Sequence, residues 1–167
     1  ADRLNQLPLA IFGIAMGIVL LPSLSKAIKN NNTQEINTTQ NRALEFCLLI
    51  ALPSAAGLYI LSSPIIHILF ERGAFLSEDT FYTAKVLSLF ALGLPAYIVI
   101  KILVTCFFAR EDTKTPLYIS IISVIINIVL SLILIGSMRE MGIALATAIS
   151  AWVNALLLFI ILRMNKN

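Results

Sequence analysis

Five long apolar stretches dominate this chain, and short polar segments separate them. A helix needs about 20 mostly apolar residues to cross a hydrocarbon core ~30 Å thick, and each stretch is close to that length. Inside lipid the backbone must satisfy its own hydrogen bonds, which favours helices. The sequence therefore predicts an all-α, polytopic transmembrane helix bundle with about five helices, at residues 7–24, 43–61, 86–108, 117–135 and 143–162.

The composition agrees with a membrane-embedded chain. Of the 167 residues, 59% are hydrophobic and 13% are charged, whereas soluble domains average about 25% charged residues. So little charge could not cover this much apolar surface in water. The net charge of +3 is small, and the cations gather at helix ends. They indicate membrane orientation and argue against a nucleic-acid partner.

The cations also indicate which face is cytoplasmic. If consecutive helices alternate in direction, one face carries seven Lys and Arg residues and the other carries three. By the positive-inside rule the first face is cytoplasmic. The first set is Lys26, Lys29, Arg42, Arg110, Lys114, Arg163 and Lys166, and the second is Arg72, Lys85 and Arg139.

The connections between the stretches are expected to be short and polar. The first, from about Ser25 to Arg42, has an Asn/Thr/Gln-rich middle, which predicts a mobile segment. The chain opens Ala1-Asp2-Arg3, without an initiator Met or a signal peptide. We therefore expect an internal segment of a longer protein.

No catalytic constellation stands out, so the sequence argues against an enzyme. It has one His and no pattern typical of a catalytic triad, a metal site or a phosphate-binding loop, so we expect no metal and no cofactor. His67, near the outer end of the second stretch, is interpreted first as a hydrogen-bonding residue and second as a proton relay. Cys47 and Cys106 are interpreted as small hydrophobic residues without a disulfide.

Two cations, Arg3 and Lys101, are the candidate substrate-binding residues. An ionisable side chain inside the bilayer is costly unless it pairs, snorkels or faces water. Lys101 lies nine residues before Arg110, about 13 Å below that end of the helix at ~1.5 Å per residue. It can snorkel or pair, or it can contact substrate in a cavity. Arg3 is either an interfacial partner of Asp2 or an embedded guanidinium suited to phosphate oxygens.

Polar stripes mark the last two stretches. Such stripes avoid lipid and face either other helices or a wet cavity. They consist of Ser120, Ser123, Asn127 and Ser131 in the fourth stretch and Thr147, Ser150 and Asn154 in the fifth.

Helix-perturbing residues suggest where the bundle bends or packs closely. Pro53 and Pro95 each remove a backbone donor inside an apolar stretch and favour a kink. Gly13 and Gly17 form a Gly-x-x-x-Gly pair, which is typical of close helix packing. We assign these four residues a structural or hinge role.

Four segments, in order along the chain, carry a resemblance to a known family. They are residues 1–25, Ala51-Leu52-Pro53-Ser54-Ala55-Ala56-Gly57-Leu58, Phe70-Glu71-Arg72-Gly73-Ala74-Phe75, and Leu92-Gly93-Leu94-Pro95-Ala96 with the turn at residues 107–116. In these segments the chain resembles the MurJ/MviN family of lipid II flippases, in the MOP (multidrug/oligosaccharidyl-lipid/polysaccharide) exporter superfamily. The last two stretches match mainly in length and hydropathy.

The resemblance implies about helices eight to twelve of a fourteen-helix protein, in a MATE-like lobe of its carboxy-terminal half in the bacterial inner membrane. That family moves lipid II, a peptidoglycan precursor, from the inner to the outer leaflet by alternating access, for cell wall biogenesis and cell shape. Its cavity arginine falls on Arg3, which would hold the substrate pyrophosphate, while the role of Lys101 stays open. The implied partners are lipid II, membrane lipids and the other helices of the transporter.

Two alternative functions stay open. The chain could belong to a MOP-superfamily exporter of another lipid-linked glycan or of a drug, or to a non-transporting membrane scaffold. Asp112-Thr113-Lys114-Thr115-Pro116, together with Phe70-Glu71-Arg72-Gly73, favours lipid II over the other exported substrates.

Overall fold

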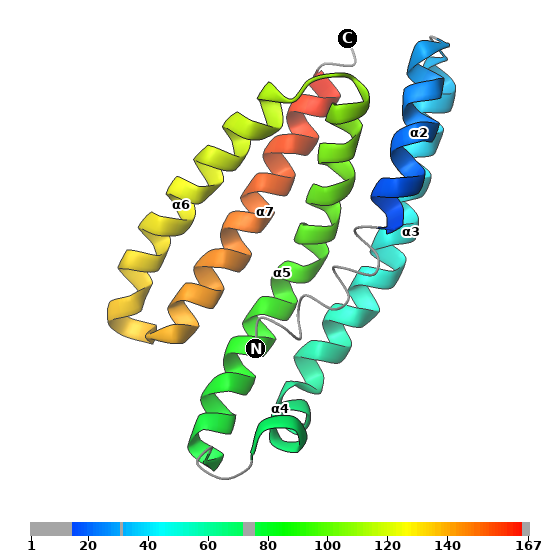
Figure 1. Cartoon of the computed structure of the whole chain (residues 1–167). Helices are drawn as coiled ribbons and strands as arrows, with labels where there is room; N and C mark the ends of the chain where they lie inside the picture. Colours follow the sequence, from blue (N-terminus) through cyan, green and yellow to red (C-terminus); the bar gives the residue numbers. More distant parts are fainter. Residues whose placement is uncertain (1–14, 31, 72–75, 165–167) are drawn as a thin grey trace.

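The computed structural model describes residues 15–30, 32–71 and 76–164, and this part of the chain is helical without a strand. Figure 1 shows the long helices running up and down beside one another, with a short helix, α4, at the lower end. The prediction of an all-α helix bundle is confirmed. The helices are α2 (Ala15–Lys29), α3 (Thr33–Ile60), α4 (Ser62–Phe70), α5 (Ser77–Ala109), α6 (Lys114–Met138) and α7 (Glu140–Met164).

Four of the described helices, α3, α5, α6 and α7, are long and apolar enough to cross a membrane. They contain 28, 33, 25 and 25 residues, more than the ~20 that a hydrocarbon core requires. The chain is therefore part of a multi-pass membrane protein. Residues 7–14 of the first predicted stretch, 7–24, lie outside the described residues, and the rest of the stretch lies in α2.

The connection between α2 and α3 differs from the mobile segment predicted between Ser25 and Arg42. Helix α2 continues to Lys29, and α3 already begins at Thr33. Asn32 caps α3, because its side-chain oxygen accepts a hydrogen bond from the Glu35 backbone N–H at 3.1 Å. Its amide group also donates to the Glu35 carboxylate at 3.1 Å. This cap satisfies a donor that a helix start leaves unpaired, so a polar sequence extends the helix beyond its apolar stretch.

The sequence patterns did not predict α4, which follows α3 directly. Pro64 has no backbone N–H and cannot donate to the Ile60 carbonyl, so α3 ends there. Within α4, Pro64 lies in the first turn, where a missing donor costs little. The fully buried Ile66 side chain then packs against Ala84 and Leu87 of α5, which holds α4 on the bundle.

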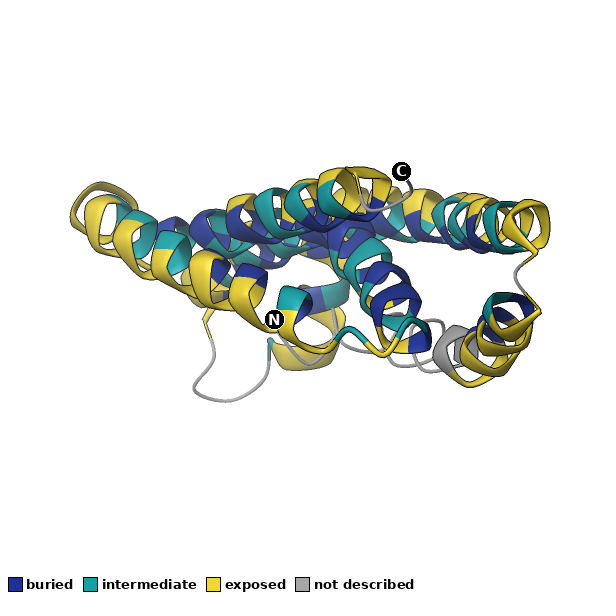
Figure 2. Cartoon of the chain, turned by 90° about the horizontal axis from the view of Figure 1, so that it is seen from above, coloured by how far each residue is buried: buried dark blue, intermediate teal, exposed yellow. Residues whose placement is uncertain are grey.

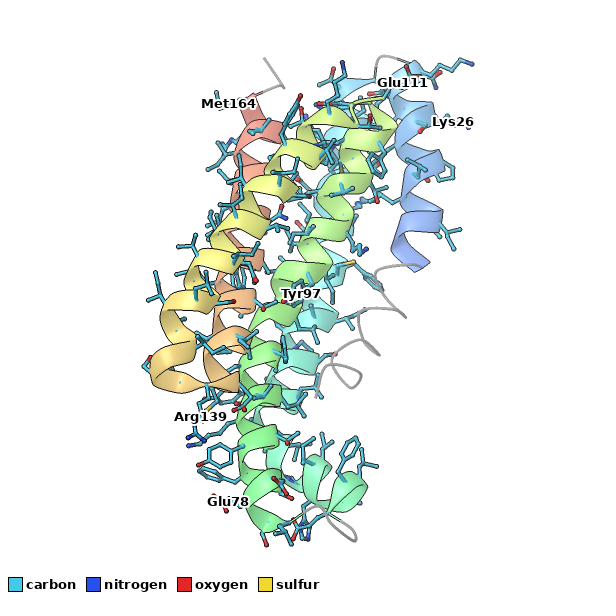
Figure 3. The ribbon with its side chains drawn as sticks, turned by 60° about the vertical axis from the view of Figure 1, so that its left-hand side comes forward. Lys26, Glu78, Tyr97, Glu111, Arg139 and Met164 are labelled. Carbon is cyan, nitrogen blue, oxygen red and sulfur yellow. The ribbon has the colours of Figure 1, made fainter. Side chains whose placement is uncertain are left out.

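Successive connections between helices lie at alternate ends of the bundle, as expected when consecutive helices run in opposite directions. Lys26, Glu111 and Met164 lie at one end, and Glu78 and Arg139 lie at the other (Figure 3). We call these the Lys26 end and the Arg139 end. The α2–α3 connection, the α5–α6 turn and the end of α7 share the Lys26 end (Figure 1). This is the grouping from which the positive-inside rule assigned the cytoplasmic face.

Helix α5 forms the centre of the core. The fully buried Leu94, Ile102 and Phe107 side chains lie along it, between the helices that pack against it. Seen from above, buried residues lie on facing sides of the helices and exposed residues on the outer sides (Figure 2). The outer surface is apolar: Leu132 and Ile133 of α6 are 70% and 65% exposed, as expected for side chains that face lipid.

Candidate functional site

The structure describes only some of the residues predicted to bind substrate or to act as hinges. Arg3 and Gly13 lie outside the described residues, and Gly17 is described only as part of the α2 backbone. Lys101 lies on α5, where its side chain is exposed and forms no salt bridge with any residue that the structure describes. Its ammonium group can therefore reach toward the membrane surface or toward a cavity completed by other helices.

Both prolines lie inside continuous helices. Helix α3 runs through the exposed Pro53, and α5 runs through the buried Pro95. Because Pro95 has no N–H, the Ala91 carbonyl loses its usual partner in the helix. Close to this gap, the Trp152 indole of α7 donates a hydrogen bond to the Leu92 carbonyl at 3.1 Å.

A polar seam joins α6 to α7. The Asn127 amide donates to the Thr147 hydroxyl at 3.2 Å and to the Ser150 hydroxyl at 3.1 Å. The Tyr97 hydroxyl of α5 donates to the Thr147 carbonyl at 3.4 Å. The prediction that the two polar stripes serve packing between helices is confirmed for these residues.

An open, mostly apolar groove of about 280 Å³ lies along this seam, lined by residues of α5, α6 and α7. Three buried polar atoms of the two stripes have no hydrogen-bond partner within the described part of the chain: Ser123 Oγ, Ser131 Oγ and Asn154 Oδ1. Buried polar atoms are nearly always bonded to protein or to ordered water. Ser123 and Asn154 line the groove, whereas Ser131 does not, so water in the groove can bond the first two.

At the Arg139 end, the Glu71 carboxylate links α4 to α5. One of its oxygens, Oε2, accepts a hydrogen bond from the Thr80 hydroxyl at 2.7 Å and lies 2.7 Å from His67 Nδ1. These hydrogen bonds, the one from Thr80 foremost, lower the pKa of Glu71 below its ordinary value of 4.5. The interpretation of His67 as a hydrogen-bonding residue is confirmed.

At the Lys26 end, Asp112 organises the turn between α5 and α6. Its Oδ1 accepts a hydrogen bond from the Thr115 backbone N–H at 3.0 Å, at the start of α6. Hydrogen bonding from Thr115 is the main reason that the pKa of Asp112 is lowered. The preceding residue, Glu111, has a positive φ of 59°, which helps the chain reverse within a few residues.

This arrangement offers groups for hydrogen bonding and the exposed charge of Lys101 on α5. Among the described residues, no group of three or more His, Cys, Asp or Glu side chains is placed to hold a metal ion. What the chain offers is an exposed cation on α5, a polar seam with unpaired atoms, and two long helices that contain proline.

A family model described as lipid II flippase MurJ matches residues 1–167. The chain belongs to the MurJ family. It is 48% identical over 159 residues to a probable lipid II flippase MurJ of Rhizobium meliloti (strain 1021), covering 95% of this chain and 30% of that protein.

Two further relatives show how widely the similarity extends. A probable lipid II flippase MurJ of Rickettsia prowazekii (strain Madrid E) is 47% identical over 95% of this chain and 31% of its own length. A lipid II flippase MurJ of Burkholderia cenocepacia is 36% identical over 98% of this chain and 32% of its own length. The chain therefore spans about a third of the length of the relatives that it matches.

Proposed function

We propose that this chain is part of a lipid II flippase of the bacterial inner membrane. The flippase moves the lipid-linked peptidoglycan precursor from the inner to the outer leaflet by alternating access. The observation that carries the proposal is the family match along residues 1–167, which is supported by relatives named lipid II flippase MurJ. The multi-pass bundle and the grouping of cations at one end fit such a protein.

The physical task explains why cations matter in this protein. A pyrophosphate group cannot cross hydrocarbon unaided, because burying its charge is very costly. A hydrated cationic cavity lowers that barrier while the lipid tail stays in the bilayer. In this proposal the Arg3 guanidinium binds the pyrophosphate through paired hydrogen bonds, and Lys101 makes a second contact.

The hinge role of the prolines is the second part of the proposal. Alternating access needs helices that bend at fixed points while their ends stay packed. Pro53 lies in the second half of α3 and Pro95 near the middle of α5, and each removes one backbone donor from its helix. Gly13 and Gly17 would permit close packing of the first helix during that movement.

The experiment uses a chimaera in which this chain replaces the matching segment of a full-length MurJ relative. The host flippase is depleted, and lipid II exposed at the outer leaflet is measured. Arg3→Ala should lower exposed lipid II at least about tenfold at equal protein abundance, because it removes charge-assisted hydrogen bonds. Lys101→Gln should cause a smaller loss. Arg139→Gln, which removes a cation from the connection between α6 and α7, is the matched control and should leave the activity intact.

The other outcomes separate the alternatives. Equal activity of the chimaera with and without Arg3 would remove that residue from substrate binding but keep the flippase. A well-inserted chimaera without lipid II transport would contradict the proposal. It would direct attention to another lipid-linked glycan, to a drug, or to a scaffold function.

A further inference from the structure

A pocket of about 400 Å³ opens at the Lys26 end of the bundle, where α3, α5 and α7 meet. We call it the interfacial pocket. Its polar residues lie nearer the Lys26 end of α3 and α7, and its apolar residues mostly lie deeper along the helices. The polar residues are Asn37, Gln40, Asn41 and Arg163, and the wall includes Leu44, Leu103 and Phe159.

Gln40 is the residue that points to a ligand. Its side chain is 3% exposed, and its Nε2 has no hydrogen-bond partner among the residues that the structure describes. A buried amide donor normally finds an acceptor, because leaving it unpaired costs free energy. Gln40 lines the interfacial pocket, so an acceptor placed there would satisfy it.

The charges around the pocket indicate that this acceptor is an anion. Arg163 is exposed in the last turn of α7, and it forms no salt bridge within the described part of the chain. The lining contains no Asp or Glu side chain. One guanidinium and several amide donors suit a single phosphate group, because Arg binds phosphate oxygens through two parallel hydrogen bonds.

The position of the pocket along the helices indicates that the phosphate belongs to a lipid headgroup. The pocket lies at the end of the bundle that the positive-inside rule assigns to the cytoplasm. Leu103 and Cys106 lie one to two helical turns before Arg110, the residue that ends α5. The polar part of the lining is therefore at the level of lipid headgroups, and the apolar part continues toward the acyl chains.

We propose that the interfacial pocket binds the phosphate headgroup of an anionic phospholipid from the cytoplasmic leaflet. The phosphate accepts hydrogen bonds from Gln40 and Arg163, and an acyl chain lies along Leu44 and Phe159. Basic pockets between membrane helices on this side commonly hold anionic headgroups. The volume equals that of roughly thirteen waters at ~30 Å³ each, which suits one headgroup. The proposal does not depend on lipid II transport.

The test uses the purified chimaera and phosphatidylglycerol as the probe, with bound lipid counted by native mass spectrometry. Phosphatidylglycerol should bind with at least about tenfold higher affinity than phosphatidylcholine. Arg163→Gln and Gln40→Leu should each weaken phosphatidylglycerol binding about tenfold, because each removes a phosphate contact. The matched control is Arg42→Gln, which removes a cation from α3 outside the pocket lining and should leave binding unchanged.

Gln40→Glu is a second test of the same contact, in case Gln40→Leu does not fold. It keeps the shape of the side chain but replaces the donor by a carboxylate that repels a neighbouring phosphate, so it should abolish the preference for phosphatidylglycerol. Equal weakening by Arg42→Gln would overturn the proposal in favour of diffuse surface charge. Unchanged binding in all pocket variants would also overturn it. Displacement of the lipid by equimolar inorganic phosphate would overturn the lipid assignment in favour of a soluble anion.

Discussion

The indole N–H of Trp152 on α7 donates a hydrogen bond to the Leu92 carbonyl of α5, at 3.1 Å. Leu92 precedes Pro95 by three residues, so the bond ties α7 to the part of α5 whose helical hydrogen bonding is already incomplete. Trp152 lies in the middle of α7. Its side chain is 43% exposed, so its polar edge contacts α5 while much of the ring faces outward.

Trp152→Phe should destabilise the packing of α7 on α5. The substitution keeps an aromatic ring but removes the indole donor, which leaves the Leu92 carbonyl without that bond. We expect a loss of about 1 kcal/mol in the free energy of unfolding, measured by denaturation of the chimaera in detergent. Tyr118→Phe, which also removes a polar group from an exposed aromatic side chain, is the control. Equal effects of the two substitutions would show that the bond to Leu92 is not stabilising.

The polar seam should show coupling between Asn127 and Thr147. A double-mutant cycle with Asn127→Leu and Thr147→Val should give a coupling free energy of about 0.6 kcal/mol, as is typical of hydrogen bonds between membrane helices. Thermal unfolding of the four proteins measures it. The matched cycle replaces Asn127 by Leu and the exposed Ser120 by Ala, and it should give no coupling. Additive effects of Asn127→Leu and Thr147→Val would contradict the bond.

Gly142 and Gly136 should respond in opposite ways to alanine. A Cβ added to Gly142 would lie 2.6 Å from the Leu134 carbonyl oxygen, a clash with backbone that cannot move cheaply. Gly142→Ala should therefore lower the free energy of unfolding by about 1–3 kcal/mol. At Gly136 nothing lies within 4 Å of the added Cβ, so Gly136→Ala should raise it by up to about 1 kcal/mol. A stabilising Gly142→Ala would disprove the close contact between α6 and α7.

The contact between α4 and α5 should weaken in acid. The pKa of Glu71 is lowered in the folded protein, so its contribution is present above the ordinary value of 4.5 and is lost as the pH falls through the lowered pKa. Melting temperatures of the chimaera at neutral pH and below pH 4.5 should therefore differ more than those of Glu71→Gln. Glu45→Gln, which removes a carboxylate from α3 away from this contact, should retain the full acid sensitivity.

The sequence predicted the all-α class and the packing of the two polar stripes between helices. Helical spacing places Asn127 with the other polar residues on one face of α6, and Thr147 and Ser150 on one face of α7. It did not predict α4, because the break at Pro64 depends on one missing donor in an otherwise apolar run. It also missed the interfacial pocket, because Gln40 lay in a segment interpreted as a mobile connection. The Asn32-to-Glu35 spacing was the available signal, since it is typical of a helix start. The lack of a partner for Gln40 depends on packing, which the sequence does not specify.

Arg139 alone separates α6 from α7, and its φ of 51° reverses the chain within that single residue. A connection of one residue is too short to let α6 slide along α7 by a helical turn of ~5.4 Å. We therefore expect α6 and α7 to keep their relative positions and to move as one rigid unit. Residues 110–113, which join α5 to α6, form a longer connection than the single residue between α6 and α7. That connection does not free the pair from α5, because the Trp152–Leu92 and Tyr97–Thr147 hydrogen bonds join α7 to α5. We therefore expect α5, α6 and α7 to move together.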